Sequence, residues 1–194
     1  MLSISGFSPG IGTPGTPITI TGTKFDPAPN NNTLKFNATT QAVNSVTNGS
    51  VLSTFVPQAA GSGRITISNV SGMVKSGQDF FIPFGDYASS DVNFTGRMSL
   101  GQSTTVTLNS SGQIGLVVFD ANAGTEIDVL AVSDSMSACL LHLFDPHGIE
   151  LDTSTCLGTG SLSPVLLPTT GTYTLGIESG NGTGGTVSLS LYGD

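Results

Sequence analysis

Carboxylates are the side chains of this 194-residue sequence that could hold a metal ion, and seven of them gather in its second half. They are Asp120, Glu126, Asp128, Asp134, Asp145, Glu150 and Asp152. Calcium takes about six to eight oxygen ligands, and the spacing of Asp120, Glu126 and Asp128 permits two ligands beside the start of a strand. No EF-hand loop or Asp-x-Asp-x-Asp array is present. We therefore interpret these carboxylates as solvated residues of turns and strand edges. Calcium binding is the alternative, and no other cofactor is expected.

The two histidines, His142 and His147, do not predict a metal centre. A zinc site needs further ligands, and no Cys/His spacing of the usual kind is present. His147 belongs to the segment Asp145-Pro146-His147-Gly148, whose residue types suit a type I turn with a left-handed exit. His142 lies on a predicted strand whose opposite face carries Leu141 and Leu143, so we interpret both histidines as structural.

The two cysteines, Cys139 and Cys156, flank this turn and are the candidates for a disulfide. Secreted sandwiches favour such bridges, and a loop of this size would contribute about 3 kcal/mol to stability. A tight turn would instead pair Cys139 with Ser154, and strict alternation would point Cys156 outward. A β-bulge within Asp152–Cys156 would remove both objections. The alternatives are therefore a disulfide and two reduced thiols.

Catalytic and sugar-binding machinery is not evident. The sequence has no Gly-x-Ser-x-Gly elbow and no plausible Ser-His-acid set, so we expect no enzyme activity. Sugar-binding modules stack rings on exposed aromatic side chains, but this chain has no Trp and three Tyr: Tyr87, Tyr173 and Tyr192. The last two lie in patterned strands, where core or edge packing is the expected role.

The elements that position these residues are predicted to be short β-strands. The chain contains 26 Gly and 10 Pro, and no window has helical spacing of apolar residues over three turns. Alternating runs in the first half are Leu2–Phe7, Ile18–Gly22, Thr33–Phe36, Ala42–Val46, Val51–Val56, Arg64–Val70 and Asp79–Ile82. Those in the second half are Val92–Met98, Thr104–Leu108, Gln113–Phe119, Glu126–Val132, Ala138–Phe144, Ile149–Thr155, Leu162–Leu166, Thr172–Ile177 and Thr186–Tyr192. Such spacing predicts an all-β chain of packed antiparallel sheets.

Charge divides the chain into two expected domains. Residues 1–84 carry four Lys/Arg against two Asp/Glu, whereas residues 85–194 carry one against eleven, within a net charge of −8. We predict domains at 1–84 and 91–194, joined by a linker at 85–90. Nucleic acid is excluded as a partner because the chain lacks a basic patch. Apolar runs of five or six residues exclude a membrane span, and the N-terminus shows no signal-peptide pattern.

A series of landmarks follows one another through the first half: Pro9, Gly15-Thr16-Pro17, Ile18-Thr19-Ile20-Thr21-Gly22-Thr23-Lys24-Phe25, Leu34-Lys35-Phe36, Val56-Pro57, Gly63-Arg64-Ile65-Thr66-Ile67, Gly72 and Phe80-Phe81. In this order of landmarks the first half resembles the IPT/TIG family of immunoglobulin-like domains. This resemblance implies an immunoglobulin-like sandwich of the kind found in bacterial surface proteins and as accessory modules of enzymes.

Four segments are characteristic of the second half: Asn93–Gly96, Leu143–Gly148, Leu167–Thr174 and Gly185–Tyr192. In these segments the second half resembles the bacterial pre-peptidase C-terminal module and the related sandwich repeats of RHS/YD-repeat proteins. This resemblance implies a jelly-roll-like, non-catalytic extracellular module, and some of its members bind calcium.

Together these features predict a non-catalytic structural or adhesive spacer, or an accessory module, in a larger bacterial secreted or cell-surface protein. Its expected partners are the neighbouring domains of that protein, together with protein or glycan ligands at a surface. The alternative function is a ligand-binding accessory module, which would bind a glycan or, with calcium, a protein.

Overall fold

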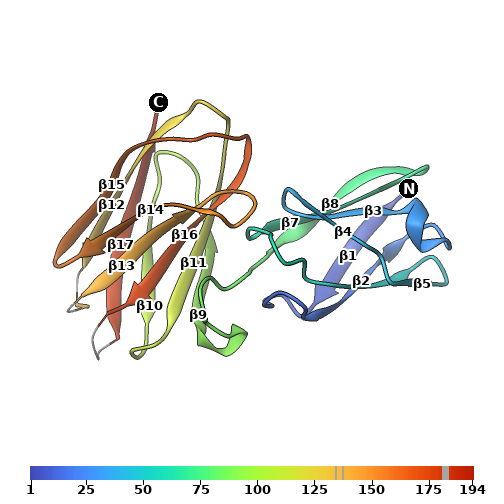
Figure 1. The fold of residues 1–194 in the computed structure, drawn as a ribbon, viewed down its shortest axis with the longest axis horizontal. Coiled ribbons are helices and arrows are strands. Elements are labelled where there is room, and N and C mark those ends of the chain that lie inside the picture. Colours follow the sequence, from blue (N-terminus) through green and yellow to red (C-terminus); the bar gives the residue numbers. More distant parts are fainter. Residues whose placement is uncertain (134, 137, 181–183) are drawn as a thin grey trace. The chain divides into compact units, whose positions relative to one another are not determined.

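The computed structural model consists of two β units, Met1–Ile82 and Pro83–Asp194 (Figure 1). It describes residues 1–133, 135–136, 138–180 and 184–194. Helical structure in these residues is confined to two single turns of 3-10 helix, η1 (Pro29–Asn31) and η2 (Ser89–Asp91). Neither turn, nor any other helix in the described part of the chain, is long and apolar enough to cross a membrane.

The first unit is an eight-stranded sandwich with immunoglobulin topology. Its strands are β1 (Ser3–Ser8), β2 (Pro17–Thr23), β3 (Thr33–Phe36), β4 (Thr39–Gln41), β5 (Ser45–Thr47), β6 (Val51–Phe55), β7 (Gly63–Asn69) and β8 (Gly72–Phe80). They form the sheets β1-β2-β6-β5 and β4-β3-β7-β8, which is the immunoglobulin order with one extra edge strand. The single strand expected at Ala42–Val46 is replaced by β4 and β5, because the chain passes there from one sheet to the other.

The core of the first unit follows from the period-two alternation of its strands. Ile18 and Ile20 on β2 are buried between exposed threonines, and Ile65 and Ile67 on β7 repeat the pattern. Successive side chains of a strand point to opposite faces, so each sheet turns an aliphatic face to the other. The ring of Phe80 packs edge-on against Phe36 of its own sheet, with 5.2 Å between ring centroids, and against Phe7 of the opposite sheet at 5.9 Å, which links the two faces.

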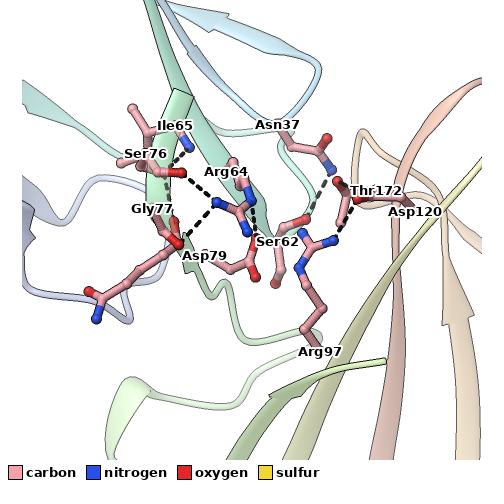
Figure 2. A network of polar contacts seen from close by, with 11 residues as sticks. Asn37, Ser62, Arg64, Ile65, Ser76, Gly77, Asp79, Arg97, Asp120 and Thr172 are labelled. Atoms are coloured by element: carbon pink, nitrogen blue, oxygen red, sulfur yellow. Dashed lines mark hydrogen bonds and ion pairs between the residues drawn. The ribbon is translucent and has the colours of Figure 1, made fainter. Parts of the chain in front are cut away.

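An irregular stretch of β8 is held by Arg64 and Ser76 (Figure 2). Here Arg64 pairs with Asp79 while Thr66 pairs with Lys75, so extra residues bulge out of β8. The Arg64 guanidinium donates to the Ser76 and Gly77 carbonyl oxygens at 2.7 and 3.0 Å. The buried Ser76 hydroxyl accepts from the Ile65 amide at 3.0 Å. Side chains thus replace the backbone hydrogen bonds that the bulge removes from the ladder.

The second unit is a jelly-roll sandwich with one added strand. Its strands are β9 (Val92–Arg97), β10 (Ser103–Leu108), β11 (Ile114–Ala121), β12 (Glu126–Ser133), β13 (Cys139–Phe144), β14 (Glu150–Cys156), β15 (Thr159–Leu166), β16 (Gly171–Ser179) and β17 (Gly185–Gly193). The sheets β10-β17-β12-β15 and β14-β13-β16-β11 give the jelly-roll order, and β9 extends the second beyond β11. The all-β sandwich fold predicted from the sequence is confirmed.

One strand pair departs from the expected antiparallel arrangement. β9 and β11 pair in parallel, with Phe94 opposite Gly115 and Gly96 opposite Val117. Between them the chain crosses to the other sheet as β10 and returns. Two reversals of direction leave β9 and β11 pointing the same way, so parallel pairing is a consequence of the crossing.

The core of the second unit is built from the inward faces of both sheets. Its buried members include Val106, Phe119, Ile127, Val129, Ala131, Leu141, Leu143, Leu175, Ile177, Val187, Leu189 and Leu191. Phe119 and Tyr173 stack with ring centroids 5.6 Å apart. The Tyr173 hydroxyl donates to the Thr169 carbonyl at 2.5 Å, which satisfies its polar group in the core.

The two units divide between Ile82 and Pro83, two residues before the boundary predicted from the sequence, and the residues predicted as a linker, 85–90, are grouped with the second unit. The reason is local packing. The Phe84 ring lies against Phe144, with centroids 5.1 Å apart, and the Asp91 carboxylate accepts from the Ala88 amide at 2.8 Å.

Candidate functional site

The β13–β14 hairpin brings the two cysteines together. Cys139 lies opposite Cys156 in the ladder, their Cα atoms are 4.9 Å apart, and their sulfur atoms are bonded. A bulge makes this register possible, but it lies at Leu151 rather than within Asp152–Cys156. Skipping one residue next to the turn shifts all of β14, so both cysteines point into the core, where they are buried.

The turn of this hairpin explains Asp145 and His147. The Gly148 amide donates to the Asp145 carbonyl at 2.9 Å, and Gly148 has a φ of 79°, as predicted for this turn. The Asp145 carboxylate accepts from the His147 and Ile149 amides at 2.9 and 2.8 Å. Its oxygens therefore satisfy backbone donors of the turn.

The first calcium candidate, Asp120, already has a donor on each carboxylate oxygen (Figure 2). Its Oδ2 accepts from Arg97 Nη1 at 2.7 Å, and its Oδ1 accepts from Thr172 Oγ1 at 2.6 Å. Asp120 is therefore part of an ion pair within the second unit, and its role as a calcium ligand stays a prediction.

The remaining described carboxylates of the predicted calcium set do not form a metal site with Asp120. Glu126 and Asp128 are exposed on β12, in the sheet opposite to that of Asp120. Asp134 lies outside the described residues. Among the residues that the structure does describe, no group of three or more His, Cys, Asp or Glu could hold a metal ion.

His142 is the centre of a cluster that sequence analysis did not find. It lies on the outer face of β13, and its Nδ1 is 2.6 Å from Glu150 Oε1 on β14. Its Nε2 faces Glu178 Oε2 on β16 at 3.7 Å, which is beyond hydrogen-bond reach. That Nε2 is buried and has no hydrogen-bond partner. An orphaned buried nitrogen is uncommon and calls for an explanation.

Aromatic rings cover this histidine. The Phe84 ring centroid lies 4.9 Å from that of His142 and 5.6 Å from that of Tyr87. Phe144 lies on the same face of β13, with its ring 6.0 Å from His142 and nearly parallel to it. Phe84 fits here because residue 176 is a glycine, whose missing side chain leaves room for the ring.

The surroundings of Tyr87 raise its pKa. Burial raises it from 10.0 to about 12, and a hydrogen bond to Glu178 together with the charges of Glu178 and Asp91 adds to the effect. When a phenol ionises it loses its proton, and with it the hydrogen bond that it donates to a carboxylate. Tyr87 therefore remains a hydrogen-bond donor to Glu178 throughout the physiological pH range.

These groups surround a hollow of about 620 Å³, which we call the His142 hollow. Its lining residues are Phe84, Gly85, Asp86, Tyr87, Asp91, Gly112, His142, Phe144, Glu150 and Glu178. All belong to the second unit. Aromatic rings form its walls, and the four acidic side chains give it acceptors for hydrogen bonds.

A signal for this site was present in the sequence. Leu141 and Leu143 point inward, so His142 and Phe144 share the outer face of the strand. A large apolar ring on an outer face indicates that something packs on it. Which segment packs there depends on a contact between Phe84 and a strand that lies far along the chain.

Comparison with known families assigns the first unit. Residues 2–82 match the model of the IPT/TIG domain. The chain contains an IPT/TIG domain. The immunoglobulin strand order and the resemblance in sequence agree with this assignment. No curated protein sequence matches the chain.

Some solved structures are similar to about half of the chain. The pre-peptidase C-terminal domain of collagenase from Bacillus anthracis has 15% identity and a TM-score of 0.43, covering 50% of this chain and 93% of that domain. PliG, a periplasmic inhibitor of g-type lysozyme from Aeromonas hydrophila, has 14% identity and a TM-score of 0.39, covering 52% of this chain and 99% of the inhibitor.

Proposed function

We propose that the chain is a non-catalytic structural segment of a larger bacterial secreted or cell-surface protein, in which two sandwiches serve as spacer or accessory modules. The observation that carries this proposal is the presence of two separate apolar cores. One is made by residues between Leu2 and Ile82, and the other by residues between Met98 and Leu191. Each unit can therefore keep its shape without help from the other.

Strand order supports a load-bearing role. The C-terminal strand β17 is hydrogen-bonded on both sides, to β10 and to β12. A pull on the C-terminus must break two ladders before this strand leaves the sheet. The N-terminal strand β1 pairs only with β2 within its sheet. We therefore expect the IPT/TIG domain to yield first when the two ends of the chain are pulled apart.

The disulfide supports a location outside the cytoplasm. Disulfides persist in oxidising compartments and are rare in the cytosol. The bond between Cys139 and Cys156 is buried in the second sandwich, where it ties β13 to β14. A bacterial cell surface or the extracellular space agrees with this chemistry.

Single-molecule force measurements on the full chain test the structural proposal. We expect two unfolding steps, one for each unit. The Cys139–Cys156 bond shields a separation of 17 residues from extension, so reduction should lengthen the larger step by about 60 Å, at about 3.6 Å per residue. A single step for the whole chain, or gradual extension without discrete steps, would contradict two independent load-bearing modules.

The His142 hollow favours a second candidate, a ligand-binding accessory module. It combines aromatic walls with convergent polar groups, which is typical of binding sites. The sequence predicts a glycan or, with calcium, a protein as the ligand, and binding of glycans to the hollow can be tested directly. A glycan array probed with the full chain and with a Phe84→Ala variant tests this version: binding that the variant loses would support it, and silence of both would remove it.

A further inference from the structure

We propose that the His142 hollow binds a primary ammonium group, such as the side chain of a lysine presented by a partner protein. This inference rests on the ligand-binding candidate above and names its ligand class. The partner it fits is a basic segment of a protein, since the recognised group is a cation that carries N–H donors.

The two carboxylates beside His142 provide the first argument. Glu150 Oε1 lies 2.6 Å from Nδ1 and Glu178 Oε2 lies 3.7 Å from Nε2, so a carboxylate stands at each ring nitrogen. A carboxylate can only accept hydrogen bonds, and an ammonium group supplies three N–H donors.

The remaining polar side chains of the hollow are also acceptors. The Tyr87 hydroxyl is engaged by Glu178, and the Nδ1 hydrogen of His142 is engaged by Glu150. Asp86 and Asp91 add two further carboxylates. A sugar hydroxyl both donates and accepts, and sites for sugars provide both kinds of group. Side chains that offer acceptors alone favour a ligand that only donates.

The aromatic walls suit the same ligand. A cation is attracted to the face of an aromatic ring when it lies within about 6 Å of the ring centroid. Phe84, Tyr87 and Phe144 surround His142 closely enough to contact the methylene chain of a lysine and its charged end. The Glu178 side chain is 27% exposed and that of Glu150 is 45% exposed, so the approach from solvent passes between carboxylates.

The electrostatic field of the second unit favours cations. Residues 83–194 contain eleven Asp or Glu and a single Lys or Arg, which is Arg97. Arg97 is bound to Asp120 at 2.7 Å, away from the hollow. The carboxylates that line the hollow are therefore not neutralised by a cationic side chain of their own unit. Such a field attracts positively charged partners and repels anions.

The test is an NMR titration of the full, disulfide-bonded chain with Nα-acetyl-lysine N-methylamide. We expect saturable shifts in the millimolar range at the amides of Tyr87, Gly112 and Glu178. The Nε-trimethyl analogue keeps the charge but has no N–H donor, and should bind more weakly. The Nε-acetyl analogue has no charge and should cause no shift. Equal shifts with the lysine and Nε-acetyl probes, or none with the lysine probe, would overturn the proposal.

Two variants of equal charge separate the site from the general field. Glu178→Gln should weaken binding of the lysine probe by about tenfold or more, because it removes a charged acceptor. Asp128→Asn removes the same charge from an exposed position on β12 and should leave binding unchanged. A similar loss in both variants would mean that the probe senses net charge rather than the hollow, which would overturn the proposal.

Chemical-shift changes caused by neutral glycans but not by the lysine probe would refute an ammonium ligand and show that the hollow binds a different ligand. The structural function is judged separately, by the force measurement.

Discussion

The Phe84 ring occupies the space above Gly176 that a side chain at that position would fill. A Cβ atom built on Gly176 would lie 2.5 Å from Phe84 Cε1, too close for any real contact. Gly176 lies in the middle of β16, opposite His142 on β13. The start of the second unit is thereby fixed to the outer face of its five-stranded sheet, and the His142 hollow forms where the two meet.

Gly176→Ala should destabilise the second unit by about 1–3 kcal/mol, because the added methyl group displaces the Phe84 ring. Chemical denaturation monitored by circular dichroism measures the change. Gly77→Ala is the matched control, since a Cβ atom there meets nothing within 4 Å, and should cost less than about 0.5 kcal/mol. In a Phe84→Ala background the cost of Gly176→Ala should largely vanish. Equal costs in both backgrounds would rule out the contact as the cause.

Tyr173→Phe should also destabilise the second unit, by about 1 kcal/mol, because it removes the part-buried hydrogen bond from the Tyr173 hydroxyl to the Thr169 carbonyl. Tyr192→Phe provides the control. Tyr192 is 51% exposed, whereas Tyr173 is 0% exposed, so the control should change stability by less than about 0.5 kcal/mol. Thermal unfolding of the two variants measures both effects. A similar change in both variants would mean that the hydrogen bond from Tyr173 to the Thr169 carbonyl contributes little to stability.

Much of the fold could be predicted because alternation is a local property. The run Ile18-Thr19-Ile20 places its apolar side chains on one face whichever strand it pairs with. The order of pairing is not local. The parallel contact of β9 with β11 depends on how often the chain crosses between sheets, which the residues of Val92–Arg97 do not encode.

The site was harder to predict than the fold. Phe84 and Tyr87 stand among Pro, Gly and small polar residues, which is the composition of a linker. Their packing depends on Gly176, which lies far away in the sequence. A glycine inside a strand is a known mark of close approach by another group, so Gly176 was the available signal. The cysteine pairing shows the same limit, since the sequence required a bulge but could not place it at Leu151.

The pKa of Tyr87 should lie well above the reference value for tyrosine. Its pKa of about 12 in the folded protein exceeds the unperturbed 10.0, so the unfolded chain loses this proton first. The stabilisation from Tyr87 is fully present below pH 10 and is lost as pH rises toward 12. Residue-resolved NMR of the tyrosine Cζ carbons measures the pKa. Glu178→Gln should lower it, because the charge and the hydrogen bond of Glu178 both raise it, and a Tyr87 pKa near 10 in the parent would refute this environment.

Reduction of the Cys139–Cys156 bond should destabilise the second unit and leave the IPT/TIG domain unchanged. The bond closes a loop with a sequence separation of 17, for which the chain-entropy model gives about 3 kcal/mol. Urea unfolding with and without a reductant measures the loss, and the transition of the first unit serves as the internal control. The double variant Cys139→Ala/Cys156→Ala should show a loss at least as large, since it also removes two buried sulfur atoms from the core. If reduction left both transitions in place, the bridge would contribute nothing to stability, and its restriction of chain extension under force would be its remaining role.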